Sequence, residues 1–138
     1  MVYSVRADTE QIFGATNVSK WADLDNDEDS DNIASRITWA IGLAHAQINA
    51  RLKGCRYTVP FTLVNSAYDE IIIDLSARLT GVLLYDNRKL VDIPEFDEVN
   101  AHREIVEATY RDIHGGRISL LVYTVNAVNY PQAIDSTA

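Results

Sequence analysis

The sequence has only one cysteine, Cys55, so no disulfide can form within the chain and a reducing compartment is expected. It also has no apolar run long enough for a membrane-spanning helix, because Asp or Arg interrupts the longest candidates. The first residues, MVYSVRADTE, lack the basic and then apolar pattern of a secretory signal. Together these absences predict a soluble, cytoplasmic protein with no membrane partner.

Basic residues are scarce: 12 Lys and Arg stand against 20 Asp and Glu, a formal net charge of -8. Most of this imbalance is local, since residues 23–32, DLDNDEDSDN, hold six of the acids and no base. A chain without a broad excess of positive charge is a poor candidate for general nucleic-acid binding. The length of 138 residues and the 47% hydrophobic content predict one folded domain with a real core.

The acidic run resembles a calcium loop at first sight. An EF-hand loop needs Gly at position six and a bidentate Glu at position twelve. A loop starting at Asp23 has Glu28 and Ala34 at those positions, and the later registers fail in the same way. We therefore expect an exposed loop that caps the following helix, with no metal site. The alternative is a weak cation site in which Asp23, Asp25 and Asp27 converge.

No other motif in the sequence indicates a catalytic or cofactor-binding site. His45, His102 and His114 are far apart in the sequence, and there is no phosphate loop, nucleophile elbow or dinucleotide fingerprint. Cys55 precedes Arg56, and a nearby cation can lower a thiol pKa, but a buried structural thiol is the simpler interpretation. We expect no catalytic residue, no cofactor and no enzymatic activity.

Hydrophobic periodicity predicts a mainly α fold. Short helices are expected at 6–14 and 17–24, followed by three long helices at about 31–53, 65–89 and 97–116, with a short extended segment at 55–61. Ser30 or Asp31 should cap the first long helix, Ser66 the second, and Gly81 should mark a close helix contact. The expected core residues share helical spacing on inner faces; they are Ile37, Ile41, Ile48, Leu75, Leu79 and Val106.

The first long helix has a second apolar face. Trp39, Leu43, Ala46 and Ala50 point away from its isoleucine stripe at 100° per residue. A helix that is apolar on two opposite faces should be covered on both. Either another subunit packs there, which makes these four residues a subunit interface, or the short N-terminal helices cover them.

After Gly115 and Gly116 the pattern changes. Residues 117–126, RISLLVYTVN, are β-branched, aromatic and nearly continuous, which favours a strand or an extended arm. We therefore divide the chain into a helical domain, 1–116, and a C-terminal extended arm, 117–138. Three arrangements are open. The whole arm binds a partner protein, or residues 118–125 fold back as a strand that pairs with RYTVPF of the same subunit. In the third, residues 118–123 pack on their own subunit and residues 124–138 bind the partner. The candidate partner-binding residues are Ile118, Leu120, Val122, Tyr123, Val125, Tyr130 and Pro131.

Several segments in this order resemble one family. They are TEQIFG and NVSKWADLD before a long helix, AHAQINARLKGCRYTVPF with its Arg-Tyr-x-x-Pro stretch, IIIDLSARLTGVLLYDNR, and a last helix that ends in Gly-Gly. Together they resemble the head–tail connector, or adaptor, proteins of tailed bacteriophages, including the Mu-like prophage connector-type proteins. The similarity covers about residues 3–120, with Arg56, Tyr57 and Pro60 as its best local match.

The resemblance implies a structural virion protein without catalytic residues. It implies a homo-oligomeric ring, usually a dodecamer, that assembles in the host cytoplasm and lies below the portal protein at the head–tail interface. Its other neighbour would be a tail-side completion or tail-terminator protein, and DNA would pass through as cargo. Two alternatives remain: another tail-completion protein on the same scaffold, or a cytoplasmic regulatory module that senses a cation through residues 23–31.

Overall fold

The computed structural model describes residues 2–64, 67, 69–88, 96–118 and 120. It contains the helices α1 (Arg6–Phe13), α2 (Ala15–Ala22), α3 (Ser30–Arg51), α4 (Asp69–Arg88) and α5 (Phe96–His114). Within those ranges no strand is present, so the expected mainly α fold class is confirmed. The expected cap Ser66 lies outside the described residues.

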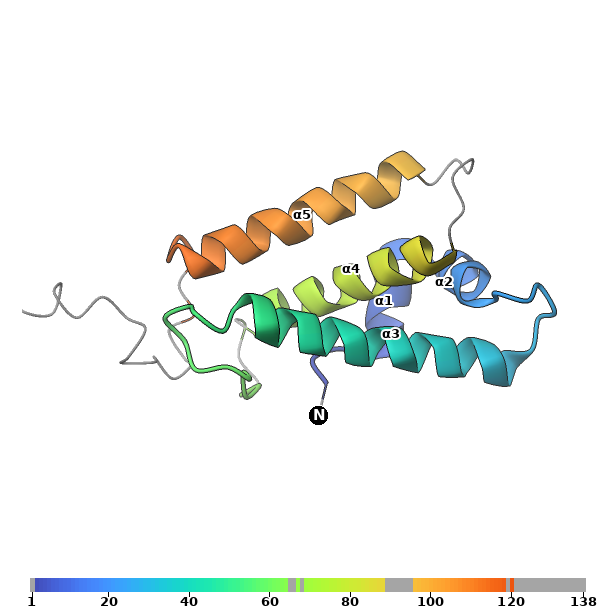
Figure 1. The fold of residues 1–138 in the computed structure, drawn as a ribbon, viewed down its shortest axis with the longest axis horizontal. Coiled ribbons are helices and arrows are strands. Elements are labelled where there is room, and N and C mark those ends of the chain that lie inside the picture. The colour runs from blue at the N-terminus through green and yellow to red at the C-terminus, as the bar shows by residue number, and fades with distance from the viewer. Residues whose placement is uncertain (1, 65–66, 68, 89–95, 119, 121–138) are drawn as a thin grey trace, which may run out of the picture.

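Helix α4 is the centre of the molecule. Helices α1, α2, α3 and α5 all pack against it, and residues on nearly every side of it are buried. Figure 1 shows α3 and α5 on either side of α4, both running in the direction opposite to it. The outer faces of α3 and α5 therefore belong to different sides of the subunit.

The core follows the predicted stripes. All six residues expected there are buried, with at most 8% of any side chain exposed. One cluster joins α3, α4 and α5 near the C-terminal ends of α3 and α5, and includes Tyr57 and Phe61 from the non-helical segment 55–61. A second cluster joins α1 and α2 to the other half of α3 and α4, around Phe13 and Trp21.

The contact between α1 and α4 depends on Gly81. A Cβ atom at this position would lie 2.1 Å from Cε2 of Phe13, so only glycine admits the ring. The predicted close packing at Gly81 is confirmed. In the same contact the hydroxyl of Thr9 donates to the carbonyl of Ala77 at 3.4 Å.

Helix α1 is stabilised at its N-terminus by the Asp8 side chain. Its first residue is Arg6, and the Asp8 carboxylate reaches back to accept the N–H of Val5 at 2.8 Å. Asp8 thus satisfies a free backbone donor from inside the first turn. Thr9 is fully buried, and its hydroxyl is used in the helix contact instead.

The chain after α5 turns back onto the body. Gly116 adopts a φ of 78°, a conformation in which glycine is favoured. Leu120 is fully buried in the first cluster, and its N–H donates to the Tyr57 hydroxyl at 2.6 Å. Ile118 is half-buried against the same cluster. These two residues pack on the helical domain, although they belong to the segment that we assigned to the arm.

Candidate interaction surfaces

The outer face of α3 is open to solvent. Trp39 is 41% exposed, Ala46 and Ala50 are exposed, and Leu43 is half-buried. The alternative that the short N-terminal helices cover this face is wrong, because α1 and α2 leave these side chains accessible. We call Trp39, Leu43, Ala46, Ala50 and the intervening Gly42 the α3 face.

The N-terminal half of the α3 face carries a cation. The Arg36 guanidinium lies 4.4 Å from the centre of the Trp39 ring, a distance typical of a cation–π contact. Arg36 Nε is buried and has no hydrogen-bond partner among the described residues. A hollow of about 320 Å³ adjoins this pair and is also lined by Asp25 and by Leu24, which is 41% exposed. Apolar, cationic and acidic groups thus meet at one end of the face.

Asp29 caps α3, one residue before the expected Ser30 or Asp31. Its Oδ1 accepts the N–H groups of Asp31 at 3.0 Å and Asn32 at 3.4 Å. Asp29 has an extended backbone, with φ at -72° and ψ at 109°, which is the conformation of an N-cap residue. The last acids of the run therefore lie at the N-terminus of α3.

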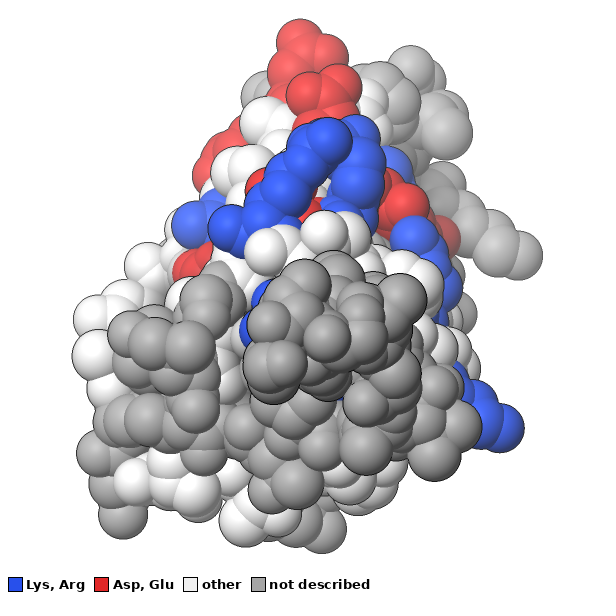
Figure 2. Space-filling model, turned by 90° about the vertical axis from the view of Figure 1, so that its left-hand side faces the viewer, with Lys and Arg blue, Asp and Glu red and all other residues white. Residues whose placement is uncertain are grey.

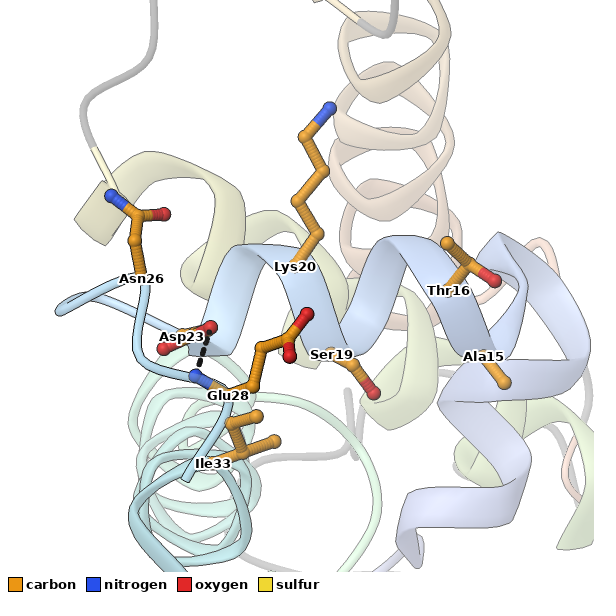
Figure 3. Close-up of a pocket in the computed structure, with 8 residues that line it drawn as sticks. All are labelled: Ala15, Thr16, Ser19, Lys20, Asp23, Asn26, Glu28 and Ile33. Carbon is orange, nitrogen blue, oxygen red and sulfur yellow. Dashed lines mark hydrogen bonds between the residues drawn. The ribbon is translucent and has the colours of Figure 1, made fainter. Parts of the chain in front are cut away.

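The remaining acids form an exposed loop, as predicted. Asp23 is half-buried; its Oδ1 accepts the N–H of Asp27 at 3.2 Å, and its Oδ2 that of Glu28 at 3.1 Å. Figure 3 shows the Asp23–Glu28 contact beside α2, at a hollow of about 580 Å³ that Lys20 and Ser19 also line. The Asp23 carboxylate thus holds its own loop together.

The structure does not bring Asp23, Asp25 and Asp27 together as a ligand set. In the described part of the chain, no three His, Cys, Asp or Glu side chains form a group that could hold a metal ion.

Sequence reasoning missed the end of the molecule where the C-termini of α3 and α5 meet. Two nitrogens of Arg51 donate to the Glu107 carboxylate at 2.9 and 3.2 Å, and the guanidinium lies 4.3 Å from the centre of the Tyr110 ring. With Arg111 and His114 these residues line an open hollow of about 550 Å³. Figure 2 looks at this end and shows Lys and Arg side chains grouped there. The related feature of the sequence is the absence of acids from residue 32 to residue 68, which by itself does not indicate a contact with α5.

Two pKa shifts at this end have different causes. The hydrogen bond from Arg51 lowers the pKa of Glu107, while burial raises the pKa of Tyr110 to about 12. The pair is well exposed, so it contributes little to stability. Its effect is to tie the two helices together at the surface.

The histidines are separate, each in its own setting. His102 Nδ1 lies 2.6 Å from Arg78 Nη1, and burial, followed by repulsion from Arg78, lowers the His102 pKa. Arg78 also forms an ion pair with Asp74, four residues earlier on α4, at 2.7 Å. The His45 ring packs on Tyr3, with ring centres 4.3 Å apart. His102 and His45 thus make structural contacts with different neighbours.

Cys55 is a buried structural thiol, as expected. Its side chain is 1% exposed, and burial raises its pKa. The Sγ atom donates to the Tyr57 carbonyl at 3.6 Å. A buried thiol with a raised pKa is a poor nucleophile.

Of the candidate partner-binding residues, the structure describes Ile118 and Leu120. Leu120, which we expected to contact a partner, is instead buried in the core of its own chain, because Tyr57 offers it a hydrogen bond beside an apolar cluster. The other five candidates, Val122, Tyr123, Val125, Tyr130 and Pro131, lie outside the described residues.

None of the helices in the described ranges combines the length and the apolar character needed to cross a membrane. Comparison of the chain with protein-family models, with curated proteins and with solved structures gave no match.

Proposed function

We propose that the chain is a structural subunit of a bacteriophage head–tail connector, an adaptor ring below the portal through which DNA passes. Two kinds of support combine in this proposal. The first is the resemblance of the segments quoted above, from TEQIFG to the Gly-Gly that ends the last helix. The second is the surface of the molecule.

The α3 face is the observation that carries the proposal. A tryptophan that is 41% exposed on a long helix beside Gly42, Ala46 and Ala50 leaves apolar surface in water, which marks an interaction site. Removing apolar surface from water contributes roughly 25 cal/mol per Å², so covering this face with a neighbouring subunit would add a favourable term to assembly. A subunit of a ring needs such a face.

The charge of the chain fits a conduit for DNA. With a formal net charge of -8, an assembled ring repels the DNA backbone and does not trap it during passage. The ring is assembled in the host cytoplasm and then becomes part of the virion. It has no cofactor and no catalytic role in this proposal.

The C-terminal residues are the proposed anchor. We infer that Val122, Tyr123, Val125, Tyr130 and Pro131 contact the portal, while Leu120 keeps the start of the segment on its own body. An extended segment can add to the edge of a partner's sheet, where backbone hydrogen bonds give affinity and alternate side chains give specificity. Deleting residues 124–138 separates the two roles, since the shortened chain should still fold but should no longer join particles. Normal incorporation of the shortened chain would reject the anchor.

Light scattering coupled to size-exclusion chromatography tests the ring. The expected mass is a high multiple of the 15.4 kDa subunit, with annular particles in negative-stain images. Ala46→Glu places a charge in the α3 face and should reduce the mass. Ala7→Glu, on the exposed side of α1, is the matched control and should leave it unchanged. A monomer at high concentration would overturn the proposal.

The same experiment with millimolar calcium addresses the cation-sensing alternative. The Asp23 and Asp29 carboxylates are already hydrogen-bonded to backbone N–H groups of the loop, so we expect no change of mass and no calorimetric binding tighter than micromolar. A calcium-dependent change of shape in a monomer would favour the regulatory module instead. The other alternative, a tail-completion protein on the same scaffold, would give a ring that binds the tail and not the portal.

A further inference from the structure

We propose that the α3 face of one subunit docks on the outer face of α5 of a second copy of this chain. The inference rests on the proposed ring and names the surface that its neighbour supplies.

Helix α5 has an apolar strip that faces away from the core. Its inner residues Val99, Val106, Tyr110 and Ile113 are at most 4% exposed. On the other side, Ala101, Ile105 and Ala108 follow one another at intervals of four and three residues, which places them along one line of the helix. Ile105 is 41% exposed, Ala101 is exposed and Ala108 is half-buried. We call these three residues the α5 face.

The two faces are complementary in shape. The α3 face alternates two large side chains, Trp39 and Leu43, with the small residues Gly42, Ala46 and Ala50. The α5 face has one projecting side chain, Ile105, between two alanines. Large residues on one helix can therefore lie over small residues on the other, so that the axes approach to about 8–10 Å.

The two faces are also complementary in charge. Between Asp31 and Asp69 the sequence has no acid, so helix α3 itself contributes bases and no acid along this face, with Arg36 held beside Trp39 and Asp25 of the preceding loop near its N-terminal end. The α5 face is bordered by the exposed acids Asp97, Glu98 and Glu104. Arg103 on the same helix is already paired with Asp86, at 2.7 Å. Contact between α3 and α5 brings opposite charges together, whereas two α5 faces would bring acids against acids.

The position of the faces makes the contact directional. Both α3 and α5 pack on α4, with α4 between them, so the two outer faces lie on different sides of one subunit (Figure 1). A contact between two different surfaces leaves one surface of each kind free, and further copies add in the same sense until the ring closes. A contact of α3 with α3 would stop at a dimer.

Thiol cross-linking between chains tests the pairing. Ala46→Cys chains are mixed with affinity-tagged chains that carry Ala101→Cys, Ile105→Cys or Ala108→Cys, and a short bismaleimide is added to the assembled protein. The wild-type chain is the background control, because Cys55 is 1% exposed. Ala7→Cys, exposed on α1, controls for random collision. We expect cross-linked pairs of Ala46→Cys with at least one α5 variant, and none with Ala7→Cys.

A second variant tests the α5 face without a cross-linker. Ile105→Asp adds an acid where the contact would be apolar, and Val2→Asp makes the same kind of change at a residue of almost equal exposure, 40%. We expect Ile105→Asp to lose the high-mass assembly while its circular dichroism spectrum stays helical. Val2→Asp should assemble like the wild type.

The outcomes separate this inference from the proposed function. Rings in which Ala46→Cys cross-links only to another Ala46→Cys would overturn the α3–α5 pairing but not the proposed ring. So would rings that still assemble with Ile105→Asp and give no cross-link between α3 and α5. A wild-type chain that remains a monomer overturns both.

Discussion

Gly81→Ala puts the contact between α1 and α4 to a direct test. The new Cβ atom would lie 2.1, 2.4 and 2.7 Å from three carbons of the Phe13 ring, all far inside van der Waals contact. The ring has little room to move, since its centre lies 5.4 Å from that of Trp21 and 4.5 Å from that of His102. Only 4% of the Phe13 side chain is exposed. Either α1 must shift or the ring must leave its position.

Two terms of opposite sign set the size of the effect. Alanine is favoured over glycine inside a helix by about 1 kcal/mol, and that term alone would stabilise the variant. Overpacking a closed core costs about 1–3 kcal/mol. Since three ring atoms clash and the ring is confined, we expect the upper part of that range and a net loss of about 1–2 kcal/mol in the free energy of unfolding.

Gly42→Ala is the matched control. Gly42 is also inside a long helix, but a Cβ atom there would have no neighbour within 4 Å. This variant should gain about 0.5–1 kcal/mol from helix propensity alone. Both variants and the wild type are unfolded in urea at a protein concentration where each is monomeric by light scattering, because Gly42 lies on the α3 face and assembly adds to apparent stability.

The reasoning is refuted if Gly81→Ala gains stability as Gly42→Ala does. A double variant identifies the cause of any loss. Phe13→Ala alone should cost about 3–5 kcal/mol, and adding Gly81→Ala to it should cost nothing more, because the ring that clashes is gone. An equal loss in both backgrounds would mean that Phe13 is not the obstacle.

Four further predictions concern the body of the protein. Leu79→Ala should lower the free energy of unfolding by about 2–5 kcal/mol in denaturant titrations, whereas a wild-type melt would mean that the α4 stripe is not core. Asp29→Ala should cost about 0.5–2 kcal/mol through the lost helix cap, and Asp25→Ala, the same charge change in the same loop, should cost less. Cys55 should react with a thiol reagent only as fast as the protein unfolds; rapid reaction of the native protein would contradict its burial. Burial, followed by Arg78, lowers the pKa of His102 in the folded state, so the unfolded state takes up more protons as the pH falls through about 6.5. Stability should therefore fall below about pH 7, and His102→Gln should show a smaller fall than the wild type across that window.

Residues whose role depends on local pattern were predictable from the sequence. Apolar residues in α3, α4 and α5 recur at intervals of four and three, which predicted the buried side of each helix. All six residues expected in the core are buried. The close packing at Gly81 also followed from residue type and position within the helix. These features depend on helix geometry, which is the same in every fold.

Features that depend on which helices meet were decided only by the tertiary structure. No local signal showed that Phe13 would fill the space at Gly81, or that Arg51 would reach Glu107 and Tyr110, 56 and 59 residues further on. Leu120 belongs to an apolar run that could have packed either on a partner or on its own core. In the structure it packs on its own core, where its N–H donates to the Tyr57 hydroxyl. Likewise, the sequence shows that α3 has a second apolar face, but it does not show whether that face is exposed. Its exposure depends on how α1 and α2 pack against α4. Side-chain spacing specifies what a helix can bury, and only the arrangement of its neighbours specifies what it does bury.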